Sequence, residues 1–155
     1  MANASDAYLR NAVLTATPEQ LHLMLYDGAI RFARQGIEGM ESHDWEEGFD
    51  GLSRAQKIIV EMLGSLNYDV DRALCTRMAG LYNFIYRKLV ESGVSRVPGP
   101  AREALKLLEY QRETWVLLID KLRQGRAPAV QPAAQPPEPR SEDLDVTYGA
   151  LSVQG

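Results

Sequence analysis

The hydrophobic pattern of this chain follows the helical period of about 3.6 residues, and it is densest between residues 79 and 91. The apolar positions there fall on two neighbouring stripes of one helix. The first stripe holds Leu81, Ile85 and Leu89, and the second holds Tyr82 and Tyr86. A surface helix needs one apolar stripe about 100° wide, and this segment exceeds that. It is therefore either the central helix of a bundle or a helix that packs inward and also presents a binding face.

Capping residues predict two helices before this segment. Thr17 can cap a helix that opens with Pro18, and Gln20 completes a capping box. Helically spaced apolar residues continue from there, so we expect this first helix to end near Ser42. Asp44 can cap the second helix, which we expect to end near residue 67 or 68.

Two further helices follow. The third, which contains residues 79–91, starts at Asp69 or Asp71 and stops at Gly93. After a loop with proline and glycine, the fourth helix is predicted over residues 101–124, with Gly125 placed to terminate it. No alternation typical of strands is sustained, so the pattern predicts an all-α fold.

Glycines inside the first two helices need an explanation, because each lowers helix propensity. Gly28 and Gly36 stand on the apolar stripe of the first helix. Gly48 and Gly51 form a G-x-x-G pattern on the second helix rather than between strands. We interpret these glycines as sites where neighbouring helices approach closely.

The predicted organisation is an antiparallel four-helix bundle over residues 17–125. Residues 1–16 are expected to form a short N-terminal arm. From residue 126 the chain becomes rich in Ala, Pro and Gln, which predicts a disordered C-terminal tail over 126–155. A short motif for another protein is the alternative for the end of this tail. Its anchors would be Leu144, Val146, Tyr148 and Leu151.

Charge and composition argue against several classes of function. The net charge of −4 lacks the basic stripe of a nucleic-acid-binding protein. No apolar run is long enough to span a membrane, and the N-terminus lacks a signal segment, so we expect a cytoplasmic protein. Cys75 is the single cysteine, which leaves no intrachain disulfide and no cysteine metal cluster.

Candidate catalytic residues are few. Glu19 and His22 form one Glu-x-x-His, whereas a carboxylate-bridged di-metal bundle needs two such motifs. His43 lies in a turn, and Cys75 has no base or orienting group nearby in sequence. We therefore expect no enzyme activity, no metal and no cofactor. The excess apolar and tyrosine surface of the second and third helices instead favours binding of a partner's amphipathic helix.

Several segments, in order, resemble the flagellin-specific export chaperones of the bacterial flagellum, the FliS family. They are Tyr8 with Asn11, residues 17–29, residues 55–61, residues 81–89 and Trp115. The resemblance covers about residues 7–124. Where this chain has Asn83 and Phe84, many relatives have Asp and Tyr.

The resemblance implies a chaperone without catalysis, whose partners are the C-terminal segment of flagellin and a component of the export gate. The flagellin segment would fold into helices on the second and third helices. Tyr8 would belong to an arm that covers the groove without cargo and is linked to docking at the export gate. The binding residues carried over are Tyr8, Ile58, Ile59, Met62, Tyr82, Ile85, Tyr86 and Leu89.

Two alternatives remain open from the sequence. Ile59 and Ile85 fit a core position as well as a groove position. The function could also be that of an adaptor or regulatory bundle that binds a different amphipathic helix, such as one from a regulatory protein or a co-chaperone of the same secretion system.

Overall fold

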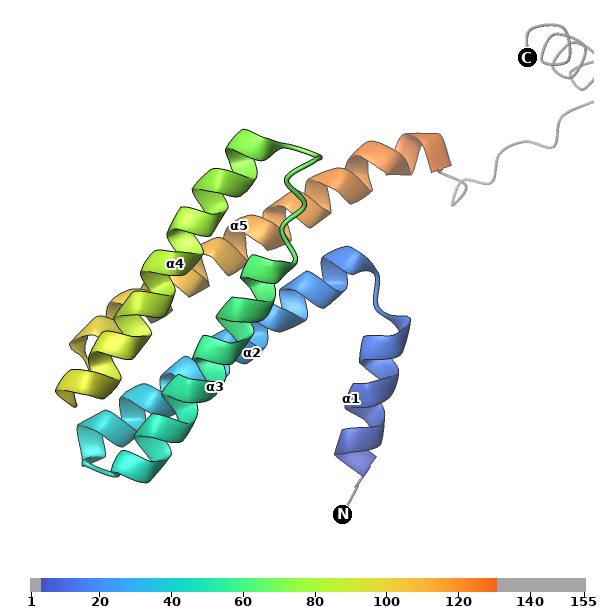
Figure 1. Cartoon of the computed structure of the whole chain (residues 1–155). Helices are drawn as coiled ribbons and strands as arrows, with labels where there is room; N and C mark the ends of the chain where they lie inside the picture. The colour runs from blue at the N-terminus through green and yellow to red at the C-terminus, as the bar shows by residue number, and fades with distance from the viewer. Residues whose placement is uncertain (1–3, 131–155) are drawn as a thin grey trace, which may run out of the picture. The chain divides into compact units, whose positions relative to one another are not determined.

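The computed structural model describes residues 4–130, with side chains up to residue 125. Within this part the chain forms α1 (Ala4–Thr15), α2 (Pro18–Ser42), α3 (Trp45–Gly64), α4 (Arg72–Ser95) and α5 (Gly99–Val130), as Figure 1 shows. The predicted all-α class is confirmed. The chain divides into two units, residues 1–117 and 118–155, and the packing described below belongs to the first. Over the described residues, no helix combines the length and apolar character that a membrane crossing requires.

The predicted caps start α2, α3 and α4. Thr17 Oγ1 accepts a hydrogen bond from Gln20 N at 3.1 Å, and the Gln20 side chain accepts one from Thr17 N at 3.0 Å. Asp44 and Asp71 each accept a bond from the backbone N–H three residues later. These bonds satisfy N–H groups that lack a partner in the first helical turn. The predicted starts are therefore confirmed, and of the two candidates Asp71, not Asp69, caps α4.

Helix ends depart further from the sequence pattern. α2 ends at Ser42 as predicted, but α4 continues two residues beyond Gly93. The residues that follow these two helices, His43 and Arg96, adopt left-handed backbone conformations with φ of 59° and 56°. Glycine is the usual residue at such a position, since it has no steric cost there. Its absence is why the sequence pattern misplaces the end of α4.

Two details of the flanks differ from the sequence pattern. Residues 4–15 of the predicted N-terminal arm form the helix α1. The prediction that Gly125 terminates the last helix is wrong, because α5 continues to Val130. A glycine inside a helix costs only about 1 kcal/mol, so it does not by itself end a helix. The rest of the predicted tail, residues 131–155, lies outside the described residues.

The core lies between α2, α3, α4 and the first half of α5. It contains alanines together with larger aliphatic and aromatic side chains. Tyr26 of α2 and Tyr82 of α4 meet across the middle, with their hydroxyl oxygens 2.8 Å apart. The other buried apolar residues are Ala29, Ile30, Ala33, Ile37, Met40, Leu52, Ala55, Ile59, Met62, Ile85, Leu89, Ala101, Ala104 and Leu108.

Glycines set the distance between α2 and α3. A Cβ atom on Gly39 would lie 2.2 Å from the backbone N of Gly48, and one on Gly51 would lie 2.4 Å from the backbone N of Gly36. Side chains cannot occupy these positions, because the opposing atoms are backbone and cannot turn away. The close approach predicted for the glycines of both helices is therefore confirmed.

α5 is attached differently. Ion pairs join it to α2, and their order shows that the two helices run antiparallel: Arg102 pairs with Glu41, Glu109 with Arg34, and Arg112 with Asp27. Lys88 of α4 pairs with Glu103 at 3.2 Å. The hydroxyl of Ser92, which is fully buried, accepts a bond from Ala101 N at 2.7 Å. α5 thus closes the bundle beside both α2 and α4.

The glycine contact can be tested with one methyl group. We expect Gly51→Ala to lower the free energy of unfolding by at least ~2 kcal/mol, because the new Cβ overlaps the backbone of α2. Urea unfolding followed by circular dichroism measures this change.

Gly80→Ala is the matched control. Gly80 is also a helical glycine, but no atom lies within 4 Å of its added Cβ. Its replacement should raise stability by about 0.5–1 kcal/mol, because alanine favours the helix. Equal effects of the two substitutions would contradict the close approach of α2 and α3.

Candidate partner-binding groove

The residues predicted to bind a partner do not share one accessible surface. Ile58 and Tyr86 are half-buried against the core, and Tyr8 on α1 is 75% exposed. The others have no exposed area: Ile59, Met62, Tyr82, Ile85 and Leu89. In this structure these five side chains belong to the core and do not line an open groove on the second and third helices. Contact of any of the eight with a partner stays a prediction.

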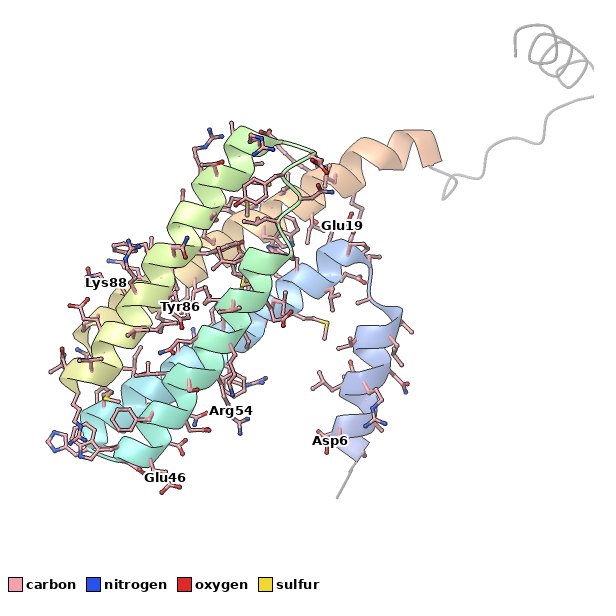
Figure 2. The ribbon with its side chains drawn as sticks, viewed as in Figure 1. Asp6, Glu19, Glu46, Arg54, Tyr86 and Lys88 are labelled. Atoms are coloured by element: carbon pink, nitrogen blue, oxygen red, sulfur yellow. The ribbon has the colours of Figure 1, made fainter. Side chains whose placement is uncertain are left out.

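Both apolar stripes of α4 turn out to be packing surfaces. The stripe with Ile85 and Leu89 is buried, and Tyr82 on the second stripe reaches the hydroxyl of Tyr26 on α2. Tyr86 lies on the side of α4 that faces α3 (Figure 2). The central-helix interpretation of residues 79–91 therefore fits the structure. A Tyr82→Ala substitution would open a cavity in the core, so it is unsuitable as a probe of surface binding.

An apolar hollow is present elsewhere, where α2 begins and α3 ends. Its volume is about 440 Å³, within the range of about 300–1,000 Å³ that ligand sites occupy. Most of its lining is apolar, and the polar groups lie among residues at helix ends. We call this hollow the end groove, and it is lined by Pro18, Glu19, Leu21, His22, Leu25, Ser65, Leu66, Asn67, Met78 and Trp115.

The close pairing of α2 and α3 explains why these residues meet. Leu21 and Leu66 stand equally far in sequence from the turn at His43 and Asp44. In an antiparallel helical hairpin with a tight turn, such positions lie opposite each other. The sequence pattern predicted both helices but did not pair these two leucines. The symmetry about the turn was the signal that could have located the groove.

Two aromatic rings pack against His22, which lines the end groove. The His22 ring stands edge-on to Tyr26, with centroids 5.1 Å apart, and its centroid is 4.6 Å from that of Trp115. Trp115 Nε1 donates a hydrogen bond to the backbone oxygen of Glu19 at 3.0 Å. Figure 2 marks Glu19 in the first turn of α2. The tryptophan predicted from the family pattern thus ties α5 to the start of α2 and forms one wall of the groove.

A chain of hydrogen bonds runs from the core to His22. Tyr82 Oη lies 2.8 Å from Tyr26 Oη and 3.4 Å from His22 Nε2. If Tyr26 donates to Tyr82 and Tyr82 donates to His22, both hydroxyl protons are satisfied, and this requires Nε2 to carry no proton. A protonated Nε2 would instead donate to Tyr82 Oη. One of the two tyrosine hydroxyl protons would then have no acceptor among the described residues, which is costly for a buried donor.

Burial disfavours the charged form of each titratable side chain in this cluster. It lowers the pKa of His22 and raises the pKa of Tyr26, because the charged form of each side chain loses solvation. Burial also raises the pKa of Tyr82, and the neighbouring Tyr26 adds to that rise. The structure therefore favours the neutral form of all three side chains.

Two other hollows differ in character. One of about 420 Å³ lies between α1 and the start of α2 and is lined by Tyr8, Asn11 and Met24, among others. The other, of about 790 Å³, is a trough along α2 and α5 whose lining includes the paired residues Arg34 and Glu109. Its lining is mostly charged, so the end groove is the better candidate for an apolar partner.

Comparison with known proteins identifies relatives over most of the chain. Residues 1–122 match the sequence model of a family described as "Flagellar protein FliS". The flagellar secretion chaperone FliS of Bacillus subtilis is 34% identical over 124 residues, covering 80% of this chain and 92% of that protein. The corresponding chaperone of Salmonella typhimurium is 28% identical over 114 residues, covering 73% and 84%. That of Campylobacter jejuni is 23% identical over 112 residues, covering 72% and 88%.

The lowered pKa of His22 predicts a pH-dependent stability. Below its ordinary value of 6.5 the unfolded chain binds a proton at His22, whereas the folded chain does not until the pH reaches the lower folded pKa. The free energy of unfolding should therefore fall as pH falls through this window. Urea midpoints at about pH 8 and pH 5.5 measure the fall, which should be smaller in His22→Gln.

His43→Gln is the control for this experiment, because His43 is the other histidine of the sequence and lies in the exposed turn after α2. It should retain the pH dependence of the wild type. If His43→Gln removes the dependence and His22→Gln keeps it, the assignment to His22 is wrong.

Proposed function

This chain belongs to the FliS family of flagellar secretion chaperones, and we propose that the protein it escorts is flagellin. It binds the C-terminal segment of flagellin in the cytoplasm, keeps that segment from polymerising early, and helps to deliver it to the flagellar type III export apparatus. It acts by binding alone, without catalysis. The observation that carries this proposal is the match of residues 1–122 to the family, together with an open apolar groove in the bundle.

We propose the end groove as the anchor site for one amphipathic helix of the flagellin segment. Leu21, Leu25 and Leu66 provide aliphatic contacts, and Met78 can adjust its shape to the side chain that enters. Such a helix presents apolar residues three or four positions apart, and an apolar groove of this size accepts one or two of them. Because Leu21 is 39% exposed, the site is open to a partner without unfolding of the bundle.

Polar groups of the end groove lie where the ends of a bound helix need partners. Ser65 and Asn67 follow α3, and Glu19 lies in the first turn of α2. Side chains of this kind can satisfy the unpaired backbone groups at the terminus of an incoming helix. These polar side chains would orient the bound helix, while the leucines and Met78 would supply most of the buried apolar area.

Folding of cargo on the chaperone limits the affinity. Burial of apolar surface gains about 25 cal/mol per Å², but a disordered segment loses conformational entropy when it becomes helical. A chaperone that must later release its cargo is suited to such a balance, because much of the gross binding energy is offset.

Surfaces outside the end groove would contact other parts of the flagellin segment and the export gate. Ile58 and Tyr86 are the half-buried members of the predicted set, and we propose that they flank longer contacts of the flagellin segment. Tyr8 and Leu14 on α1 are each 75% exposed. We assign α1 to contact with the export gate, which the exposed apolar side chains would permit.

One substitution in the groove tests this function. Leu21→Glu should weaken binding of the C-terminal segment of flagellin from the same organism at least ~10-fold, equivalent to about 1.4 kcal/mol, because a carboxylate would replace an apolar contact. Isothermal titration calorimetry measures the affinity, and circular dichroism verifies the fold.

The control is Val94→Glu. Val94 is 80% exposed at the C-terminal end of α4 and does not line the end groove. It should bind like the wild type. Equal binding by all three proteins would place the flagellin segment on another surface. Failure of the wild type to bind would reject flagellin as the partner and would favour an adaptor for a different amphipathic helix.

A further inference from the structure

The end groove contains one side chain that can change its charge near neutral pH. The sequence has two histidines, and His22 is the one that lines the groove. Its ring is half-buried between Tyr26 and Trp115, and Nε2 faces the hydroxyl of Tyr82. An apolar cargo helix in the groove would therefore cover an imidazole that already has little access to water.

The other titratable groups around His22 do not compensate a positive charge on it. On α2 and α4 the nearby hydroxyls belong to Tyr26 and Tyr82, whose pKa values burial raises, so both stay neutral. The lining residues from the end of α3 carry no charge. On α4, Arg77 precedes Met78 and is exposed.

Carboxylates on the neighbouring elements are few. Glu19 of α2 is the one charged residue that lines the end groove besides His22. On α5, Arg112 and Glu113 line the separate charged trough, and Arg112 pairs with Asp27. No ion pair to His22 forms among the described residues.

We propose that His22 couples cargo binding to its own protonation state: the end groove holds the cargo helix while His22 is neutral, and protonation of His22 weakens that hold. This inference rests on the proposed function, because it concerns the regulation of the same site.

Desolvation supplies the first reason. A cargo helix excludes water from the groove, and a charged imidazole loses more solvation there than a neutral one. Cargo binding therefore lowers the pKa of His22 further than folding alone does. By linkage, the chain must release part of a proton when cargo binds in the range where His22 titrates, and added protons must oppose binding.

The hydrogen-bond chain supplies the second reason. In the neutral state Tyr26, Tyr82 and His22 Nε2 can form one continuous series of donors and acceptors. Protonation makes Nε2 a donor to Tyr82, and one of the two tyrosine hydroxyl protons then has no acceptor among the described side chains. The strain acts on α2 and α4 together, the two helices that carry His22 and Met78 into the groove.

The pH dependence of the affinity is limited, because only the one proton on His22 is linked to binding. One linked proton changes an affinity by at most about tenfold per pH unit. Between about pH 7.5 and pH 5.5 we expect the affinity for the C-terminal flagellin segment to fall roughly 3–8-fold, since the pKa of His22 already lies below 6.5 without cargo and only part of its titration falls in that window.

Calorimetric titration of the full chain with this flagellin segment, at both pH values, tests the proposal. His22→Gln should keep its affinity within roughly twofold across the window, and His22→Phe, which retains a ring against Trp115, should do the same. His43→Gln should lose affinity like the wild type. A second readout is proton release, seen when the wild-type binding enthalpy at about pH 6 depends on the ionisation enthalpy of the buffer.

The outcomes separate the two proposals. Loss of affinity at low pH in the wild type and in His43→Gln, but not in the His22 variants, supports the coupling. Binding that is independent of pH, or equally dependent in all variants, overturns the coupling and leaves the flagellin function intact. Absence of binding by the wild type at about pH 7.5 rejects the flagellin function, and the coupling with it. If both variants misfold, the proton-release measurement on the wild type decides.

Discussion

The backbone-to-backbone approach of α2 and α3 is the constraint on which the rest of the bundle depends. Gly39 meets Gly48, and Gly51 meets Gly36, so neither helix can slide past the other without an overlap of backbone atoms. This contact fixes the register of the hairpin from its turn outwards. The register then places Leu21 opposite Leu66, away from these four glycines. Gly64 near Leu66 makes no such contact, since no atom lies within 4 Å of its added Cβ. The same pairing of α2 and α3 thus determines both the tight contact near the turn and the position of the end groove at the other end of the hairpin.

The attachment of α5 contrasts with this tight pairing. Its ion pairs to α2, such as Arg34 with Glu109, join side chains that are about half exposed, and pairs of that kind stabilise a fold by at most about 1 kcal/mol each. Burial of Ala101, Ala104 and Leu108 therefore holds the first part of α5 in place. Trp115 adds one directed bond near the groove. A bundle that is rigid on its α2–α3 side and less tightly attached at α5 is suited to admit a helix beside Trp115.

Local signals in the sequence predicted the parts of this fold that depend on local chemistry. Thr17, Asp44 and Asp71 mark helix starts because each side chain satisfies a nearby backbone N–H. Helical glycines predicted a close crossing. The sequence could not separate core from groove on α4, because Tyr82 is polar enough for a surface and is buried only through its partner Tyr26. Nor could it predict the continuation through Gly125, because a glycine costs only about 1 kcal/mol inside a helix and is not an obligatory helix end.

A chain of hydrogen bonds connects the buried core to the end groove, and it joins Tyr26, Tyr82 and His22. A buried pair of hydroxyls is less favourable than an apolar pair unless every proton has an acceptor, so the pair depends on a third group at its end. That group is His22, which lies at the boundary between core and groove. The hydrogen bonding of the core is therefore completed by a side chain that a partner would cover. Any event in the groove that alters His22 must also alter the contact between α2 and α4.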